Sequence, residues 1–132
     1  MRIVIDSNIW INVFINNDSQ SFIKKILDRE IEIISSSRQV EEVSNVLSRP
    51  KIKNVIAHEL IEEFLILFFK SVDIVETKIK IKVCRDEKDN FILETAISGS
   101  VDYIVTEDKD LLVLNPYETV KIVTAKEFYK II

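Results

Sequence analysis

The sequence predicts an α/β fold, a three-layer α/β/α sandwich built around a central, mostly parallel sheet. Short apolar segments alternate along the chain with segments of helical periodicity. The segments 2–5, 31–34 and 102–105 are hydrophobic almost throughout, as is typical of parallel strands covered on both faces. The chain has 132 residues, 47% of them hydrophobic, which is enough for one buried core. With no repeat or linker, we expect a single domain over residues 1–132.

The first quarter of the chain predicts two strands separated by two helices. Arg2–Ile5 is apolar after its first residue and predicts a short buried strand. Asn8–Phe14 and Ser21–Leu27 both carry apolar residues at helical spacing. Ile31–Ile34 predicts the second strand.

Two helices are expected next. Ser36 and Gln39 have the spacing of a capping box and open a helix over 36–49, which ends before Pro50. A longer helix is expected over 54–70, with the asparagine at its first position as the cap.

The following segments predict two strands and a helix. Val72–Val75 is a candidate third strand, and Lys78–Val83 alternates lysine with apolar residues, as a half-exposed strand does. Asp89–Ser98 has helical periodicity, and Gly99 is placed as the residue that follows the helix.

The last part of the chain repeats the alternation. Asp102–Thr106 and Lys121–Val123 are predicted strands. Thr124 and Glu127 form a second capping-box pattern, which opens a terminal helix. In folds built from such parallel strands, ligands bind at the carboxyl ends of the strands.

Composition excludes several kinds of site. The only cysteine, Cys84, can form neither an internal disulfide nor a cysteine zinc site, and the only histidine is His58. A metal here must be held by oxygen ligands, which favours Mg²⁺ or Mn²⁺. The N-terminus lacks a signal-peptide pattern and the longest apolar run, 64–69, is too short for a membrane span, so we expect a cytoplasmic protein without a membrane partner.

Charge alone disfavours a nucleic-acid partner, because the formal net charge is −4. That objection weakens if several carboxylates cluster and are neutralised by bound cations. The question is therefore which of the 22 acids face inward.

Two acids stand out in the first half of the chain. Asp6 directly follows the first strand. Glu42 lies at the edge of the apolar stripe of its helix, whereas Glu41 points away from that stripe. The alternatives are that Asp6 only caps the next helix and that Glu42 only pairs with Arg38 or Arg49.

Asp89 projects onto the apolar face of its helix, where a charge is costly unless it is paired or bound to metal. The alternative is a simple N-cap. Asp86 is expected to be a loop acid or the cap itself.

Asp108 and Asp110 follow the strand at 102–106, and the alternative for both is an ordinary turn. Ser7 and Thr106 lie next to these acids and could orient a carboxylate or a bound water, or could be simple caps. Four acids at strand ends or on inward faces predict a site for one or two hard cations: Asp6, Glu42, Asp89 and Asp108.

Four sequence segments, in order, resemble the PIN-domain nucleases, and most closely the toxin components of prokaryotic toxin–antitoxin systems (VapC-like). They are VIDSN at 4–8, EVSNVLSRPK at 42–51, RDEKDN at 85–90 and DYIVTEDKDLL at 102–112. The resemblance covers nearly the whole chain.

The resemblance implies a PIN-like sandwich and Mg²⁺- or Mn²⁺-dependent cleavage of RNA, with an antitoxin protein as a possible partner. It places the metal-binding acids on Asp6, Glu42, Asp89 and Asp108. It also matches Asp110 to a frequent extra acid, and Ser7 and Thr106 to the usual hydroxyl positions. Glu107 departs from the pattern, because a small residue is more usual there.

Two surfaces suggest partners. Basic residues are unevenly spread: Arg49, Lys51 and Lys53 follow the helix of Glu42, Lys24 and Lys25 lie on an early helix, and Lys78, Lys80 and Lys82 share one face of their predicted strand. Some of them could contact phosphates, and the alternative for the last three is that they protect an exposed sheet edge. The helix over 54–70 is more apolar than one buried face requires. It could form a homodimer or antitoxin surface, or could be deeply covered; the surplus residues are Ile61, Ile66, Leu67 and Phe69.

Two other functions compete with a nuclease. A phosphotransfer receiver domain also collects acids at strand ends, but it needs a phospho-accepting aspartate after a central strand and a lysine after a late one. The sequence has no clear match to that arrangement. A non-catalytic RNA-binding or scaffold module on the same fold is the other alternative.

Overall fold

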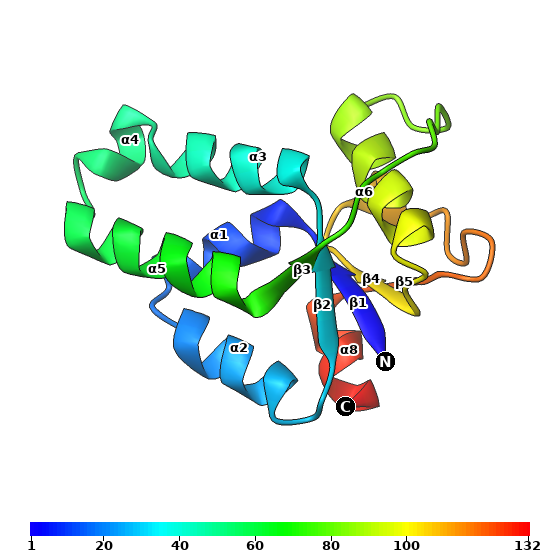
Figure 1. The fold of residues 1–132 in the computed structure, drawn as a ribbon, viewed down its shortest axis with the longest axis horizontal. Helices are drawn as coiled ribbons and strands as arrows, with labels where there is room; N and C mark the ends of the chain where they lie inside the picture. The colour runs from blue at the N-terminus through cyan, green and yellow to red at the C-terminus, as the bar shows by residue number, and fades with distance from the viewer.

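The computed structural model describes residues 1–132, and its strands and helices alternate along most of the chain (Figure 1). In chain order the elements are β1 (Arg2–Ile5), α1 (Ser7–Ile15), α2 (Ser19–Leu27), β2 (Glu32–Ser35), α3 (Ser37–Leu47), α4 (Pro50–Lys53), α5 (His58–Ser71), β3 (Val72–Ile74), α6 (Glu87–Ser98), β4 (Tyr103–Val105), α7 (Lys109–Leu112), β5 (Lys121–Val123) and α8 (Ala125–Ile131).

The five strands form one sheet in the order β3-β2-β1-β4-β5, and every neighbouring pair is parallel. β1 is the central strand, and its Ile3, Val4 and Ile5 are fully buried. Its register against β4 pairs Ile5 with Val105, so the residues that follow the two strands emerge side by side.

Helices cover both faces of the sheet, as Figure 1 shows. Ile3 and Ile5 face a large core with α1, α2, α3, α5 and α8, centred on the fully buried Trp10. Val4 points to the other face, where it packs with α6 and α7. The predicted three-layer α/β/α sandwich is confirmed. None of the helices is long and apolar enough to cross a membrane.

The prediction of a strand over Lys78–Val83 is wrong, because this segment has no regular secondary structure. Its backbone donors bond to side chains of α6 instead of a neighbouring strand. Ile81 N donates to Glu94 Oε2 at 3.0 Å, and Val83 N donates to Asn90 Oδ1 at 3.2 Å. The alternating pattern comes from a segment packed against a helix, which has the same inside-outside periodicity.

Three predicted helix boundaries also need correction. Ser36 caps α3 by accepting from Gln39 N, but the Gln39 side chain does not complete a capping box. α3 ends at Leu47, before the short α4. The cap position of α5 is Ala57, not the asparagine at position 54.

Gly99 ends α6, but not in the left-handed conformation that usually favours glycine after a helix. Its φ is −87°, and it is the next residue, Ser100, that has a positive φ of 50°. Glycine is needed at 99 for space, because an added Cβ would lie 2.7 Å from Cγ2 of the fully buried Ile34.

We therefore expect Gly99→Ala to lower the free energy of unfolding by about 1–3 kcal/mol, as overpacking a core commonly does. Ser100→Gly should leave that free energy equal or raise it, because glycine adopts a positive φ without strain. Urea denaturation of both variants checks this. Equal stability of Gly99→Ala and the wild type would contradict the close approach.

Candidate metal centre

The centre of the site is formed where β1 and β4 end. Asp6 N donates to Val105 O at 2.9 Å, which extends the strand pairing by one residue. Thr106 Oγ1 donates to Asp6 Oδ2 at 2.7 Å and accepts from Asp108 N at 3.0 Å. The fully buried Thr106 thus fixes both the Asp6 carboxylate and the turn that carries Asp108.

Asp6 occupies the N-cap position of α1, but its side chain makes no capping hydrogen bond. Its carboxylate is directed to Thr106 instead, so capping does not account for this residue.

Asp108 and Asp110 lie at the start of α7. Asp108 Oδ1 accepts from Asp110 N at 2.9 Å and caps that helix. Asp108 therefore also has the local structural role that the sequence offered as the alternative to metal binding. Asp110 pairs with Arg85 through contacts of 3.1 Å to both carboxylate oxygens.

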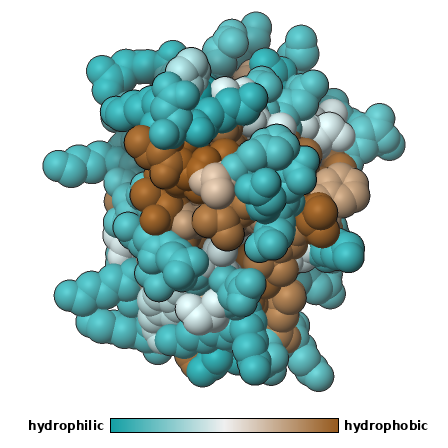
Figure 2. All heavy atoms as spheres, turned by 90° about the vertical axis from the view of Figure 1, so that its left-hand side faces the viewer, coloured by the Kyte–Doolittle hydropathy of each residue, from teal (hydrophilic) through white to brown (hydrophobic).

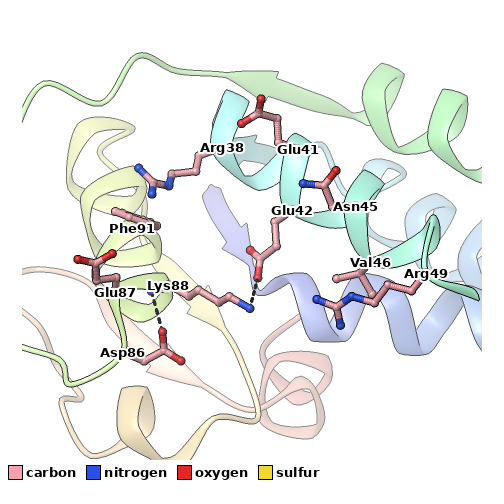
Figure 3. Close-up of a pocket in the computed structure, with 10 residues that line it drawn as sticks. All are labelled: Arg38, Glu41, Glu42, Asn45, Val46, Arg49, Asp86, Glu87, Lys88 and Phe91. Carbon is pink, nitrogen blue, oxygen red and sulfur yellow. Dashed lines mark hydrogen bonds and ion pairs between the residues drawn. The ribbon is translucent and has the colours of Figure 1, made fainter. Parts of the chain in front are cut away.

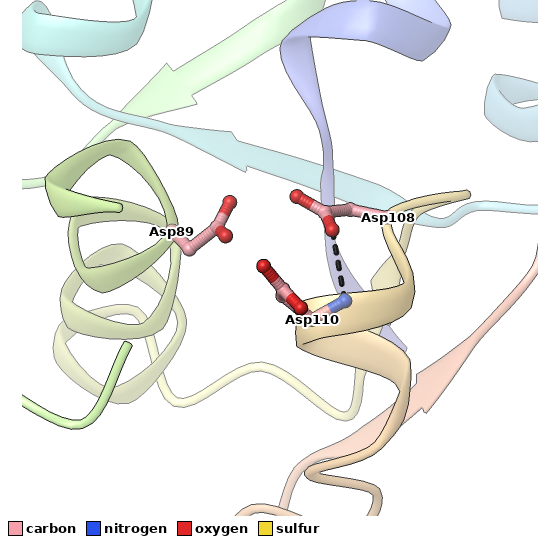
Figure 4. A group of neighbouring side chains, drawn as sticks. All are labelled: Asp89, Asp108 and Asp110. Carbon is pink, nitrogen blue, oxygen red and sulfur yellow. Dashed lines mark hydrogen bonds between the residues drawn. The ribbon is translucent and has the colours of Figure 1, made fainter. Parts of the chain in front are cut away.

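Asp89 enters the same space from α6, on the opposite side (Figure 4). Asp89 is only 6% exposed. The N-cap of α6 is Asp86, whose side chain accepts from Lys88 N at 3.0 Å. The cap alternative for Asp89 is therefore wrong. Carboxylate oxygens of Asp89, Asp108 and Asp110 lie within 4.8 Å of one another.

Glu42 faces this group from α3. It is half-buried while Glu41 is exposed, so the helical phase inferred from the sequence is confirmed. Ser7 Oγ donates to Glu42 Oε2 at 3.0 Å, and Lys88 Nζ lies 3.7 Å from Oε1 (Figure 3). Glu42 forms no ion pair with Arg38 or Arg49, so the alternative role that the sequence offered for it is wrong.

Gln39 supports this side of the site, a role that sequence reasoning missed. Its side-chain amide donates to Ile5 O at 2.6 Å and to Ser7 Oγ at 3.4 Å, and it accepts from Ser35. The buried Gln39 therefore ties the ends of β1 and β2 to the hydroxyl that holds Glu42. A polar residue at an inward helical position was the available signal.

Glu107, the departure from the family pattern, does not add a carboxylate to the cluster. Its Oε1 accepts from Ala125 N at 3.0 Å, at the start of α8.

Burial and mutual repulsion raise the pKa of two of these acids. The pKa of Asp6 is raised mainly by burial and further by the charges of Asp108 and Glu42, against the opposing effect of the Thr106 hydrogen bond. Burial raises the pKa of Asp89 to about 7, with added effects of a hydrogen bond to Asp108 and of the charges on Asp108, Asp86 and Asp6.

The donor set suits a hard divalent cation. All of the groups are carboxylate oxygens, and their closeness is unfavourable without a positive charge between them. Asp6, Asp89, Asp108 and Asp110 could hold such an ion, and Glu42 could reach the same space from α3.

The raised pKa of Asp89 predicts how the stability of the metal-free protein changes with pH. The folded pKa of about 7 lies above the ordinary value of 3.8, so between these values the folded protein binds the extra proton. The free energy of unfolding of the metal-free protein therefore falls as the pH rises from about 4 to about 7. We expect Asp89→Asn, measured by thermal unfolding in EDTA, to gain stability over the wild type across that range.

The gain should be absent near pH 4 and constant above about pH 8. Glu41→Gln, which removes an exposed acid, is the control and should show no such trend. An Asp89→Asn variant that is no more stable than the wild type at pH 8 would show that neither burial nor neighbouring charges destabilise the Asp89 carboxylate.

The chain is similar to known proteins over most of its length. A family model described as the PIN domain matches residues 2–110. The crystal structure of PAE2754 from Pyrobaculum aerophilum shares the fold with a TM-score of 0.66 and 17% sequence identity, over 98% of this chain and 88% of that chain. No curated protein sequence matches this chain significantly. With a family match over most of its length and the fold described above, the chain belongs to the PIN-domain family.

Proposed function

We propose that this protein is a Mg²⁺- or Mn²⁺-dependent endoribonuclease that hydrolyses RNA phosphodiester bonds. The observation that carries the proposal is the meeting of Asp89, Asp108 and Asp110 next to Asp6, at the carboxyl end of a parallel sheet. PIN domains are generally metal-dependent nucleases, which supports this chemistry. The choice of RNA as substrate follows from the family resemblance in the sequence.

Divalent ions held by these carboxylates would activate a water molecule for attack on phosphorus and stabilise the charge of the leaving oxygen. The residues of the chain supply orientation. Thr106 fixes Asp6 through its hydroxyl, and Ser7 fixes Glu42 in the same way. Loss of such a supporting contact commonly lowers metal affinity or activity by roughly 10- to 100-fold.

Two alternatives are weaker. A phosphotransfer receiver domain is disfavoured by the match to the PIN family. A non-catalytic RNA-binding or scaffold module would not need the buried, mutually repelling carboxylates of Asp6 and Asp89.

We further propose that the protein acts in the cytoplasm as the toxin of a toxin–antitoxin pair, neutralised by an antitoxin protein. The closeness of its sequence segments to such toxins supports this role. A small neighbouring reading frame with a DNA-binding pattern would strengthen it.

A homodimer is also proposed, because α5 leaves large apolar side chains in solvent. Leu60, Ile66 and Phe69 are 52%, 56% and 61% exposed, whereas Ile61 is buried, contrary to its expected place in the surplus face. Figure 2 shows apolar surface gathered on the side of the molecule where α4 and α5 lie.

Metal-dependent cleavage is the first test. We expect RNA to be cut with Mg²⁺ or Mn²⁺ and to remain intact with EDTA. Glu42→Gln should remove most of the cleavage, whereas Glu41→Gln, one position away on the same helix, should retain it. Thr106→Val should weaken metal binding roughly 10- to 100-fold, as loss of an outer contact does.

Cleavage that survives EDTA would exclude the metal mechanism. Loss of activity in Glu41→Gln but not in Glu42→Gln would show that the site has been assigned to the wrong face of α3. Intact RNA with wild-type protein and Mn²⁺ would favour the non-catalytic alternative.

Self-association is tested by light scattering at micromolar concentration. We expect a dimer that dissociates in Phe69→Lys, because the substitution places a charge in the apolar contact. Val113→Lys, which places the same charge on an exposed apolar residue outside α5, is the control. A wild-type monomer would contradict the proposal.

A further inference from the structure

A groove begins beside Glu42, the candidate site acid on α3, and runs along α6. Its inner part, about 450 Å³, contains Glu42 and Lys88. Its outer part, about 750 Å³, is lined by the segment 77–82 and by α6. Both parts share Arg38, Glu87 and Phe91, so they meet at these residues.

Lys78, Lys80 and Lys82 line the outer part, are exposed and form no ion pair. They do not protect a sheet edge, because their segment belongs to no strand. The alternative suggested by the sequence is therefore wrong, and the three free positive charges need another explanation.

The lysine segment is held in place by buried polar side chains of α6. Glu94 accepts from Ile81 N at 3.0 Å. Asn90 accepts from Val83 N and Cys84 N, at 3.2 and 2.9 Å, and donates to Cys84 O at 3.2 Å. These bonds replace strand pairing and keep the lysines beside the groove.

Arg38 and Phe91 form a stack where the two parts of the groove meet. The Arg38 guanidinium carbon lies 3.3 Å from the centre of the Phe91 ring, and Figure 3 shows the two side chains facing each other from α3 and α6. Arg38 is exposed and lines both parts of the groove, so its planar guanidinium group is accessible to a ligand there. Unpaired bases stack on such planes.

We propose that this groove binds single-stranded RNA on one side of the cleavage site, with Arg38 as a platform for an unstacked base and Lys78, Lys80 and Lys82 as phosphate contacts. The proposal rests on the proposed ribonuclease function and adds to it the path of the strand and the residues that contact it.

The charges that line the groove favour this path for an RNA strand. The acids of the metal centre repel a phosphate backbone, and the net charge of the chain is −4. The outer groove brings together four basic residues and two acids, and one of those acids, Glu94, is occupied by Ile81 N. A substrate strand therefore meets a basic surface within a protein that is acidic as a whole.

The test uses a fluorescent single-stranded RNA of about 20 nucleotides, with binding measured by anisotropy in EDTA over a range of salt concentrations. The triple variant Lys78→Ala, Lys80→Ala, Lys82→Ala is compared with Lys24→Ala, Lys70→Ala, Lys130→Ala. The control removes the same charge from exposed positions on α2, α5 and α8.

We expect the groove variant to bind roughly tenfold more weakly and its log–log salt slope to fall by about 2, since each phosphate contact to a single strand contributes about 0.7. The control variant should bind like the wild type. Equal losses in both triple variants, or none in either, would overturn the phosphate path.

Arg38→Lys keeps the charge but removes the plane. We expect about fivefold weaker binding of single-stranded RNA with an unchanged salt slope, and no change for duplex RNA of the same sequence, whose bases are already stacked. An equal loss for both substrates, or no loss, would overturn the base platform.

Cleavage by the wild type with Mn²⁺ separates this proposal from the proposed function. If the wild type cuts RNA while the groove variant binds as tightly as the control, the path is wrong and the nuclease stands. If the wild type neither binds nor cuts RNA, the proposed function and the path both fail.

Discussion

The parallel register between β1 and β4 is the constraint on which the site depends. It pairs Ile5 with Val105, so Asp6 and Thr106 emerge next to each other and are joined by a hydrogen bond of 2.7 Å. Thr106 also accepts from Asp108 N, which sets the turn into α7. A slip of one residue in this register would turn Ile3 and Ile5 to the wrong core and would separate these groups. The same pairing therefore determines both the packing and the chemistry.

The carboxylates of the candidate site lie close together, and they differ in the groups that offset their charge. Asp6 and Asp89 lie in a buried, acidic space that raises the pKa of both. Glu42, in contrast, has the Ser7 hydroxyl and the Lys88 ammonium group beside it. The two sides of the site thus differ in their cationic partners. On the aspartate side only the exposed Asp110 has one, Arg85, whereas on the glutamate side Lys88 lies beside Glu42.

Most of the fold could be predicted from the sequence, because buried strands and amphipathic helices have strong local patterns. The same periodicity distinguished Glu42 from Glu41 correctly. It failed at Lys78–Val83, because alternation reports only which side chains face inward, and the backbone partners there are distant side chains on α6. Gln39 was misjudged for a related reason: a local capping pattern fitted it, whereas its real partners lie at the ends of β1 and β2.

The residues of the candidate site come from the sheet and from both helical layers. Asp6 follows the central strand, Glu42 belongs to the layer with α1 and α5, and Asp89 and Asp108 belong to the layer with α6 and α7. No single layer carries the set, so a chain in which only one core has formed has no complete site. If the protein is a ribonuclease, a nascent chain in which only one core has formed cannot cut RNA, because part of the site is still missing.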